Sequence, residues 1–311
     1  MVMDNSDLHI AKNNKSDEFY TQPDVIAAEL EYYTRHFEGA RVYCNCDDPS
    51  MSMFWVYFHK NFKRLGLEKL VSTRYEKGGI SYKMEYSGGN DMDVSSGTMT
   101  GLLSDGDFRS RECVGLLDES DIVVTNPPFS LFRDYVNLLM LHKKRFLIIG
   151  NMNALTYKDF FPYVKDGDVW LGPSISSGDR SFWVPDDYEL KAAGCGIDEN
   201  GRKYIRVKGV RWFTNLDHEK RHERLILEKT YEPGMYELYS NYGAINVDHV
   251  KDIPDNYRGV MGVPITFLDK YCPEQFEITG FRKGFDGKDL YYIKDNKKVC
   301  PYLRILIRCR R

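Results

Sequence analysis

Short apolar runs alternate with amphipathic segments through the first half of the chain, and this pattern predicts strands separated by helices. The runs that we expect to be strands are rich in β-branched residues and lie at 41–46, 67–73, 122–125 and 146–151. Apolar residues at helical spacing occupy the segments from Phe54 to Leu65 and from Leu131 to His142. Strands that are apolar on both faces and alternate with helices are typical of a parallel sheet, so we expect an α/β fold.

The two ends of the chain differ from this central pattern. Before the first strand we expect a helix over 24–35, capped by Thr21 or Asp24. After the last strand of the pattern, aromatic and glycine-rich segments follow, and we expect the first of them to complete the sheet. Short strands and turns then take over. We therefore predict one domain over 1–228 and a β-rich region over 229–311.

Charge is distributed unevenly, although the net charge is only −3. Lys and Arg outnumber Asp and Glu by 8 to 3 within 200–225 and by 10 to 3 within 281–311. This asymmetry favours a polyanionic partner, and ordinary charged surface is the alternative. The 7 cysteines lack framework spacing, so we expect reduced thiols. We find neither an apolar run of about 18 residues nor a signal-peptide pattern, which predicts a cytoplasmic protein without a membrane partner.

The clearest candidate for chemistry follows the strand at 122–125, where the chain reads Asn126-Pro127-Pro128-Phe129. Two prolines end a strand and fix the backbone. Asn126 and the Pro127 carbonyl are therefore held at the carboxyl edge of the sheet, where open α/β folds bind ligands. With the ring of Phe129 beside them, these groups predict a receptor for a planar base that carries an exocyclic amino group. An ordinary Pro-Pro turn is the alternative.

This motif resembles the Asp/Asn-Pro-Pro-Tyr/Phe motif of amino-methyltransferases that depend on S-adenosylmethionine. The resemblance implies that Asn126 and the Pro127 carbonyl accept hydrogen bonds from the target amino group while Phe129 stacks on the base. Further matches occur in family order at 17–21 and at 107–108. The residues that the resemblance assigns to the cofactor are Phe19, Tyr20, Thr21, Asp47, Asp48, Pro49, Ser52, Asp107 and Phe108.

The segment 47–52 narrows the family. It reads Asp-Asp-Pro-x-x-Ser where most members have a glycine-rich loop, and with the phenylalanine-rich helix after it, it resembles the EcoRI-type adenine-specific DNA methyltransferases. This resemblance implies a Rossmann-like methyltransferase fold, no metal, and a target-recognition region at 229–311. It also implies N6 methylation of an adenine flipped out of double-stranded DNA in a restriction-modification system. A cognate restriction endonuclease would share the site without having to bind the enzyme.

Other functions remain open at this point. The same motif serves amino groups of RNA bases and of protein glutamine, and a DNA-binding module without catalysis would also be basic. His218-Glu219-Lys220-Arg221-His222 matches the HExxH pattern of zinc peptidases. The residues within and around it are charged, which describes a solvated helix better than a walled metal site. We therefore expect no zinc there and favour contact with the DNA backbone.

Overall fold

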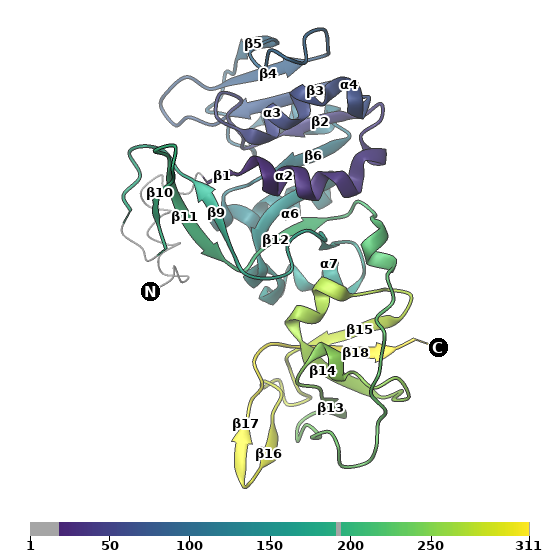
Figure 1. Ribbon diagram of the computed structural model, residues 1–311. Helices are drawn as coiled ribbons and strands as arrows, with labels where there is room; N and C mark the ends of the chain where they lie inside the picture. Colours follow the sequence, from purple (N-terminus) through teal and green to yellow (C-terminus); the bar gives the residue numbers. More distant parts are fainter. Residues whose placement is uncertain (1–18, 191–193, 311) are drawn as a thin grey trace. The chain divides into compact units, whose positions relative to one another are not determined.

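The computed structural model describes residues 19–190 and 194–310, which form two compact units (Figure 1). The first unit extends to Thr156 and resumes over Ser174–Leu216. The second contains Tyr157–Pro173 and the chain from Asp217 onward. The short segment Tyr157–Pro173 therefore belongs to the second unit, and the chain then returns to the first. It enters the second unit again at Asp217, which precedes the boundary that we predicted after residue 228.

A large mixed sheet forms the centre of the first unit, with its strands in the order β5-β4-β3-β2-β6-β7-β12. Strands β3, β2, β6 and β7 are parallel, whereas β4, β5 and β12 are antiparallel to their neighbours. The bounds are β2 (Arg41–Cys44), β3 (Lys69–Arg74), β4 (Tyr82–Tyr86), β5 (Thr98–Gly101), β6 (Ile122–Thr125), β7 (Arg145–Asn151) and β12 (Val210–Thr214). All four predicted strands are present, and the α/β class is confirmed.

Helices pack against this sheet through buried apolar side chains. Their bounds are α2 (Pro23–Leu30), α3 (Met53–Lys60), α4 (Phe62–Leu65), α5 (Arg111–Glu119) and α6 (Phe132–Leu141). Leu30 of α2 and Phe58 of α3 belong to one buried cluster with Val42 of β2 and Val124 of β6. Strand β6 is buried at every position, which explains its unbroken apolar sequence.

The first helix begins and ends differently from our prediction. Its N-cap is Gln22, which makes no side-chain hydrogen bond, so the capping role predicted for Thr21 or Asp24 is wrong. Pro23 sits in the first turn, where its fixed φ favours a helix start without such a bond. The α-helix ends at Leu30 and a 3₁₀ helix, Glu31–His36, continues it.

The connections between the parallel strands define the crevice in which such sheets bind ligands. From β2 the chain crosses to β3 on one side, and it later enters β6 on the other side of β2. The strand order therefore reverses between β2 and β6. In open α/β sheets the ligand site lies outside the carboxyl ends of the strands at this point. Asp47 follows β2 and Asn126 follows β6, so both flank the crevice.

A second sheet of the first unit is built from the N-terminal strand and from the aromatic segments. Its order is β1-β9-β11-β10, with β1 (Tyr20–Thr21), β9 (Asp179–Trp183), β11 (Lys203–Lys208) and β10 (Gly196–Ile197). We expected the first of the aromatic segments to complete the main sheet. Within Ser174–Leu216, β12 lies in the main sheet, whereas β9, β10 and β11 form the second sheet. Of these, β9 pairs with β1, a long-range partner that no local pattern reveals.

The second unit contains mainly short strands among its regular elements. One sheet has the order β13-β14-β18-β15, and β16 and β17 form a separate hairpin. The strands are β8 (Trp170–Leu171), β13 (Ala244–Asn246), β14 (Val260–Pro264), β15 (Phe276–Phe281), β16 (Tyr292–Lys294), β17 (Lys297–Val299) and β18 (Arg304–Cys309). The one α-helix of this unit within the described residues is α7 (Phe161–Lys165). Within 19–190 and 194–310, none of the helices has the length and apolarity needed to cross a membrane.

Candidate active site

The side chain of Asp47 joins the carboxyl ends of β2 and β6. Its Oδ1 accepts a hydrogen bond from the Ser52 hydroxyl at 3.0 Å. Its Oδ2 accepts one from the Thr125 hydroxyl and a longer one, 3.4 Å, from the backbone N–H of Asn126. Asp47 is therefore the link between the acidic turn after β2 and the Asn-Pro-Pro-Phe loop after β6.

This carboxyl group is buried, with 7% of Asp47 exposed. Burial raises the pKa of Asp47 to about 7, although the hydrogen bonds from Thr125, Ser52 and Asn126 favour the charged form. The Asp47 carboxyl group therefore changes its charge close to neutral pH. When it is protonated, the proton occupies a lone pair that could otherwise accept a hydrogen bond from a neighbouring donor.

The rest of the acidic turn is held by local contacts. Ser52 is the N-cap of α3, and its hydroxyl accepts from the backbone N–H groups of Phe54 (3.1 Å) and Trp55 (3.4 Å). Asp48 accepts from the Tyr82 hydroxyl at 2.8 Å and lies 3.4 Å from Arg74 Nε. Pro49, which lies between Asp48 and Ser52 in the sequence, is buried. A capped helix start thus replaces the glycine-rich loop of related folds.

Asn126 is buried and its amide is oriented by the N-terminal segment. Its Nδ2 donates to the backbone carbonyl of Phe19 at 2.5 Å. Its Oδ1 is buried and has no hydrogen-bond partner within the described residues, as is also true of Thr21 Oγ1 and Asn45 Nδ2. Such orphaned polar atoms are costly unless a ligand satisfies them. The ends of β1, β2 and β6 therefore have the polar groups that a bound cofactor and substrate would require.

Phe129 of the Asn-Pro-Pro-Phe loop packs with two other phenylalanines, Phe19 and Phe182. The ring of Phe129 meets Phe19 edge-on at 5.8 Å and Phe182 edge-on at 6.1 Å, and Phe19 lies 6.0 Å from Phe182. Phe182 comes from β9, where it pairs with Thr21 of β1. The orientation of Phe129 is thus fixed by both neighbours. Pro127 is buried before it, whereas Pro128 is half-buried.

The Asp107-Phe108 segment lies at the end of β3. The carbonyl of Asp105 accepts from Glu76 N–H at 3.0 Å, and Gly106 has φ +80°. Phe108 is buried and meets the ring of Tyr135 at 5.0 Å. Asp107 Oδ2 lies 2.6 Å from Arg109 Nη2, and this hydrogen-bonded cation lowers the pKa of Asp107. The segment thus faces the same carboxyl edge as Asp48, with its carboxylate engaged by an exposed arginine.

A comparison with known families decides between the candidate functions. A family model described as "Adenine-specific methyltransferase EcoRI" matches residues 7–309. The chain belongs to this family. Type II methyltransferase M.EcoRI of Escherichia coli is 48% identical over 98% of this chain and 96% of its own length. Type II methyltransferase M.MpnI of Mycoplasma pneumoniae is 38% identical over 86% of this chain and 83% of its own length. No solved structure matches the chain.

The protein is therefore an adenine-specific DNA methyltransferase of the restriction-modification type, which confirms the function predicted from its sequence. Among the residues that the sequence singled out in this methyltransferase, Asp47 and Asn126 flank the crevice and are joined by a hydrogen bond. Residues 17 and 18 of the N-terminal motif fall outside the described residues. Tyr20 is half-buried on β1 and pairs with Trp183.

Sequence reasoning missed some residues of the methyltransferase site. Phe182 and Thr125 carry no motif, and only the pairing of β1 with β9 and the contact between β6 and Asp47 reveal them. Asn151 also lies at the carboxyl end of a sheet strand, β7, and its Nδ2 donates to the Lys208 carbonyl at 2.8 Å.

The HExxH segment of the methyltransferase adopts a short 3₁₀ helix, Glu219–His222, instead of the α-helix that a zinc site needs. His218 Nε2 lies 3.2 Å from the Leu171 carbonyl, and burial lowers the pKa of His218 to about 4. His222 lies 2.7 Å from Asp217 and 2.8 Å from Glu274. Across the described chain, no group of three or more His, Cys, Asp or Glu side chains is arranged to hold a metal ion.

Proposed function

We propose that this methyltransferase methylates N6 of an adenine that has been flipped out of double-stranded DNA, with Asn126, Pro127, Pro128 and Phe129 as the catalytic loop. The observation that carries the proposal is the buried Oδ1 of Asn126, which has no hydrogen-bond partner among the described residues and belongs to the same loop as Phe129. An adenine amino group has the donor that this acceptor lacks. An adenine inside a duplex cannot reach a buried atom, so flipping is required.

The chemistry asks little of the protein beyond position and hydrogen bonding. The lone pair of an adenine amino nitrogen is delocalised into the ring, so that nitrogen is a poor nucleophile. Asn126 Oδ1 and the Pro127 carbonyl would accept its two hydrogens, which favours a more tetrahedral, electron-rich nitrogen. Phe129 would stack on the base and fix the direction of its attack. The amino nitrogen would form a bond to the transferred methyl carbon as the bond from that carbon to sulfur breaks with its electron pair going to sulfur, and the nitrogen would release one proton to solvent.

The cofactor would occupy the crevice between β2 and β6, within a Rossmann-like methyltransferase fold. S-adenosylmethionine supplies an electrophilic methyl group on a sulfonium when it is bound. Phe19, Tyr20 and Thr21 would contact its methionine end, and the orphaned Thr21 hydroxyl supports this role. The acidic turn would border the middle of the site through Asp47, Asp48, Pro49 and Ser52.

The adenine end of the cofactor is assigned to Asp107 and Phe108. Asp107 would accept a hydrogen bond from the cofactor amino group. Arg109, which engages Asp107 in the structure, is 53% exposed at its side chain and can turn to solvent. Phe108 would pack beside the adenine from its place against Tyr135. No metal takes part in this scheme.

The second unit would recognise the DNA. Support comes from its charge, since residues 281–311 hold 10 Lys and Arg against 3 Asp and Glu. Such side chains bind phosphates and base edges. A cognate endonuclease would cleave the same sequence when it is unmethylated, and an enzyme with this substrate would act in the cytoplasm.

The decisive test is transfer of labelled methyl groups from S-adenosylmethionine to unmethylated genomic DNA. We expect label in N6-methyladenine with the wild type and about 100- to 1,000-fold slower labelling with Asn126→Ala. Label in RNA or in protein glutamine, with none in DNA, would contradict the proposal and identify the alternative acceptor. Cofactor binding without transfer to any of the three would favour a module that only binds DNA.

A further inference from the structure

A tight loop over 282–290 in the second unit presents the side chain of Phe285 to solvent. This ring is 81% exposed. Single exposed apolar residues are common on protein surfaces, so exposure alone has no functional meaning. What distinguishes Phe285 is how firmly the chain holds it in this exposed position.

Asn241 anchors the loop through its backbone and its side chain. The backbone N–H of Phe285 donates to the Asn241 carbonyl at 2.9 Å. The side-chain Nδ2 of Asn241 donates to Asp286 Oδ1 at 2.9 Å and to the Asp289 carbonyl at 3.0 Å. A Cβ on Gly284 would lie only 2.3 Å from Asn241 Nδ2, so this close approach requires glycine. The loop therefore cannot readily collapse to bury the ring.

One face of the Phe285 ring is already covered. It stacks on Tyr242 with a centroid distance of 4.4 Å and an interplanar angle of 20°. A side chain that inserts between two base pairs must offer both faces of its ring to them. Phe285 has only its other face and its edge available, which suits contact with a small apolar group on a surface.

The charges around the loop suit a DNA groove. Arg282 and Lys283 both pair with Asp289, at 2.9 and 2.7 Å, and Lys288 follows on the same loop. The next element is the β16–β17 hairpin, which carries Lys294 and two further lysines at 297–298. Cations of this kind hold a protein on the phosphates. The apolar group that the bases present in the major groove is the C5-methyl of thymine.

We infer that Phe285 contacts the C5-methyl group of one thymine in the recognised sequence and so contributes to sequence specificity. The inference rests on the proposed DNA-binding role of the second unit. Loss of one buried methyl-sized contact corresponds to about a four-fold change in affinity or in kcat/KM. If Phe285 contacts one methyl group, removing that group lowers the affinity or kcat/KM at one position only. If Phe285 contacts DNA without regard to sequence, its loss lowers the affinity for all sequences alike.

The test uses a duplex substrate whose target adenine is unmethylated, and it replaces each thymine, one at a time, by 2′-deoxyuridine, which lacks only the C5-methyl group. Methyl transfer is measured as kcat/KM for the wild type, for Phe285→Ala and for Tyr302→Ala. Tyr302 is a matched control, because its ring is 76% exposed in the same unit but lies outside the loop. Thermal unfolding of each variant checks that the fold is intact.

We expect deoxyuridine at one position to lower wild-type kcat/KM about four-fold. Phe285→Ala should lose the same factor on normal DNA and nothing more at that position, while Tyr302→Ala behaves like the wild type. The inference would be overturned if Phe285→Ala had the kcat/KM of the wild type on normal DNA. It would also be overturned if deoxyuridine lowered the kcat/KM of Phe285→Ala further at every position. Lys288→Ala tests the proposed role of the unit separately. If it leaves the DNA affinity and its salt dependence unchanged while Phe285→Ala is also silent, the DNA-binding role itself is wrong.

Discussion

The side-chain amide of Asn126 donates a 2.5 Å hydrogen bond to the backbone carbonyl of Phe19, 107 positions earlier in the chain. This contact determines the positions of the nitrogen and the oxygen of the Asn126 side-chain amide. Because Nδ2 is occupied, Oδ1 must face away from Phe19, and it has no partner among the residues that the structure describes. The N-terminal segment therefore orients an acceptor that a substrate amino group can satisfy.

Asn126→Ala should abolish most methyl transfer while cofactor binding largely persists. Removal of one well-placed hydrogen-bonding group from an active site lowers kcat by about 100- to 1,000-fold. Single-turnover transfer to DNA measures this loss, and calorimetric titration with S-adenosylmethionine measures binding. Asn151→Ala is a matched control, because Asn151 also lies at the carboxyl end of a sheet strand but its amide bonds the backbone of Lys208 and Asn153, and the variant should remain active. Loss of cofactor binding with an intact fold would contradict the assigned role.

Phe129→Ala should lower the single-turnover rate more than it lowers DNA affinity. Stacking of an aromatic ring on a base contributes about 1–3 kcal/mol, which is roughly a 5- to 150-fold effect. Phe129→Tyr keeps the ring and should remain close to wild type. A fluorescent adenine analogue at the target position would report whether the flipped base is still held. Equal rates for the alanine and tyrosine variants would rule out stacking by this ring.

Much of the main sheet could be predicted from the sequence, since its parallel strands carry continuous apolar runs that end in turns. The Asn-Pro-Pro-Phe loop was equally visible, because Pro127 and Pro128 fix the end of β6 through local backbone restrictions. Phe182 could not be found in this way. Its role depends on the pairing of β9 with β1, and such long-range pairing leaves no local signal.

The first helix and the HExxH segment show the other limit of sequence reasoning. A cap was expected at Thr21 or Asp24, but Pro23 allowed the helix to begin after Gln22 without one. His218 looked like part of a solvated helix, whereas it is buried in the second unit, near the Leu171 carbonyl. In both cases tertiary context overrode the local pattern.

Gly106→Ala should destabilise the first unit and weaken cofactor binding. Gly106 has φ +80°, and an added Cβ would lie 2.3 Å from the Arg74 carbonyl oxygen. Backbone atoms cannot move aside easily, so the loop that carries Asp107 must shift. We expect a loss of stability of about 1–3 kcal/mol, from the strain at this φ alone. Urea unfolding and cofactor titration measure the two effects.

Gly115→Ala is the matched control for that substitution and a prediction with the opposite sign. Gly115 lies within α5, and an added Cβ would meet nothing within 4 Å. Alanine in a helix interior is favoured over glycine by about 1 kcal/mol. The variant should therefore unfold at higher urea concentration than wild type and keep its activity. If both glycine variants were equally destabilised, the clash at Gly106 would not be the cause.

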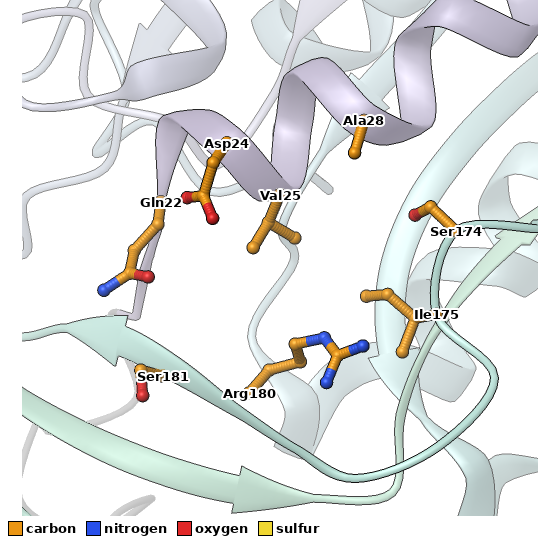
Figure 2. A pocket seen from close by; sticks show the side chains of 8 residues that line it. All are labelled: Gln22, Asp24, Val25, Ala28, Ser174, Ile175, Arg180 and Ser181. Carbon is orange, nitrogen blue, oxygen red and sulfur yellow. The ribbon is translucent and has the colours of Figure 1, made fainter.

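The polar pocket beside the N-terminal strand borders a buried acid that should make stability depend on pH. The pocket, of about 360 Å³, is lined by α2 and by residues around Ser174 and Arg180 (Figure 2). The backbone N–H of Ser174 donates to Glu29 Oε2 at 2.9 Å, and the Tyr33 hydroxyl lies 2.9 Å from Glu29 Oε1. Glu29 is fully buried, and this burial raises its pKa from 4.5 to about 7.

A carboxyl group whose pKa is raised on folding binds its proton more tightly in the folded state. Its contribution to stability is therefore most favourable below pH 4.5 and is lost as the pH rises to about 7, by a total of about 3 kcal/mol.

Glu29→Gln removes this pH dependence and preserves the local hydrogen bonds, because the glutamine carbonyl can accept from Ser174 and its amide nitrogen can donate to the Tyr33 oxygen. Relative to wild type, the variant should gain stability as the pH rises from 5 to 8. Urea unfolding across that range measures the gap, with Glu31→Gln, a 61% exposed neighbour, as control. A gap that stayed constant with pH would show that Glu29 remains charged when folded.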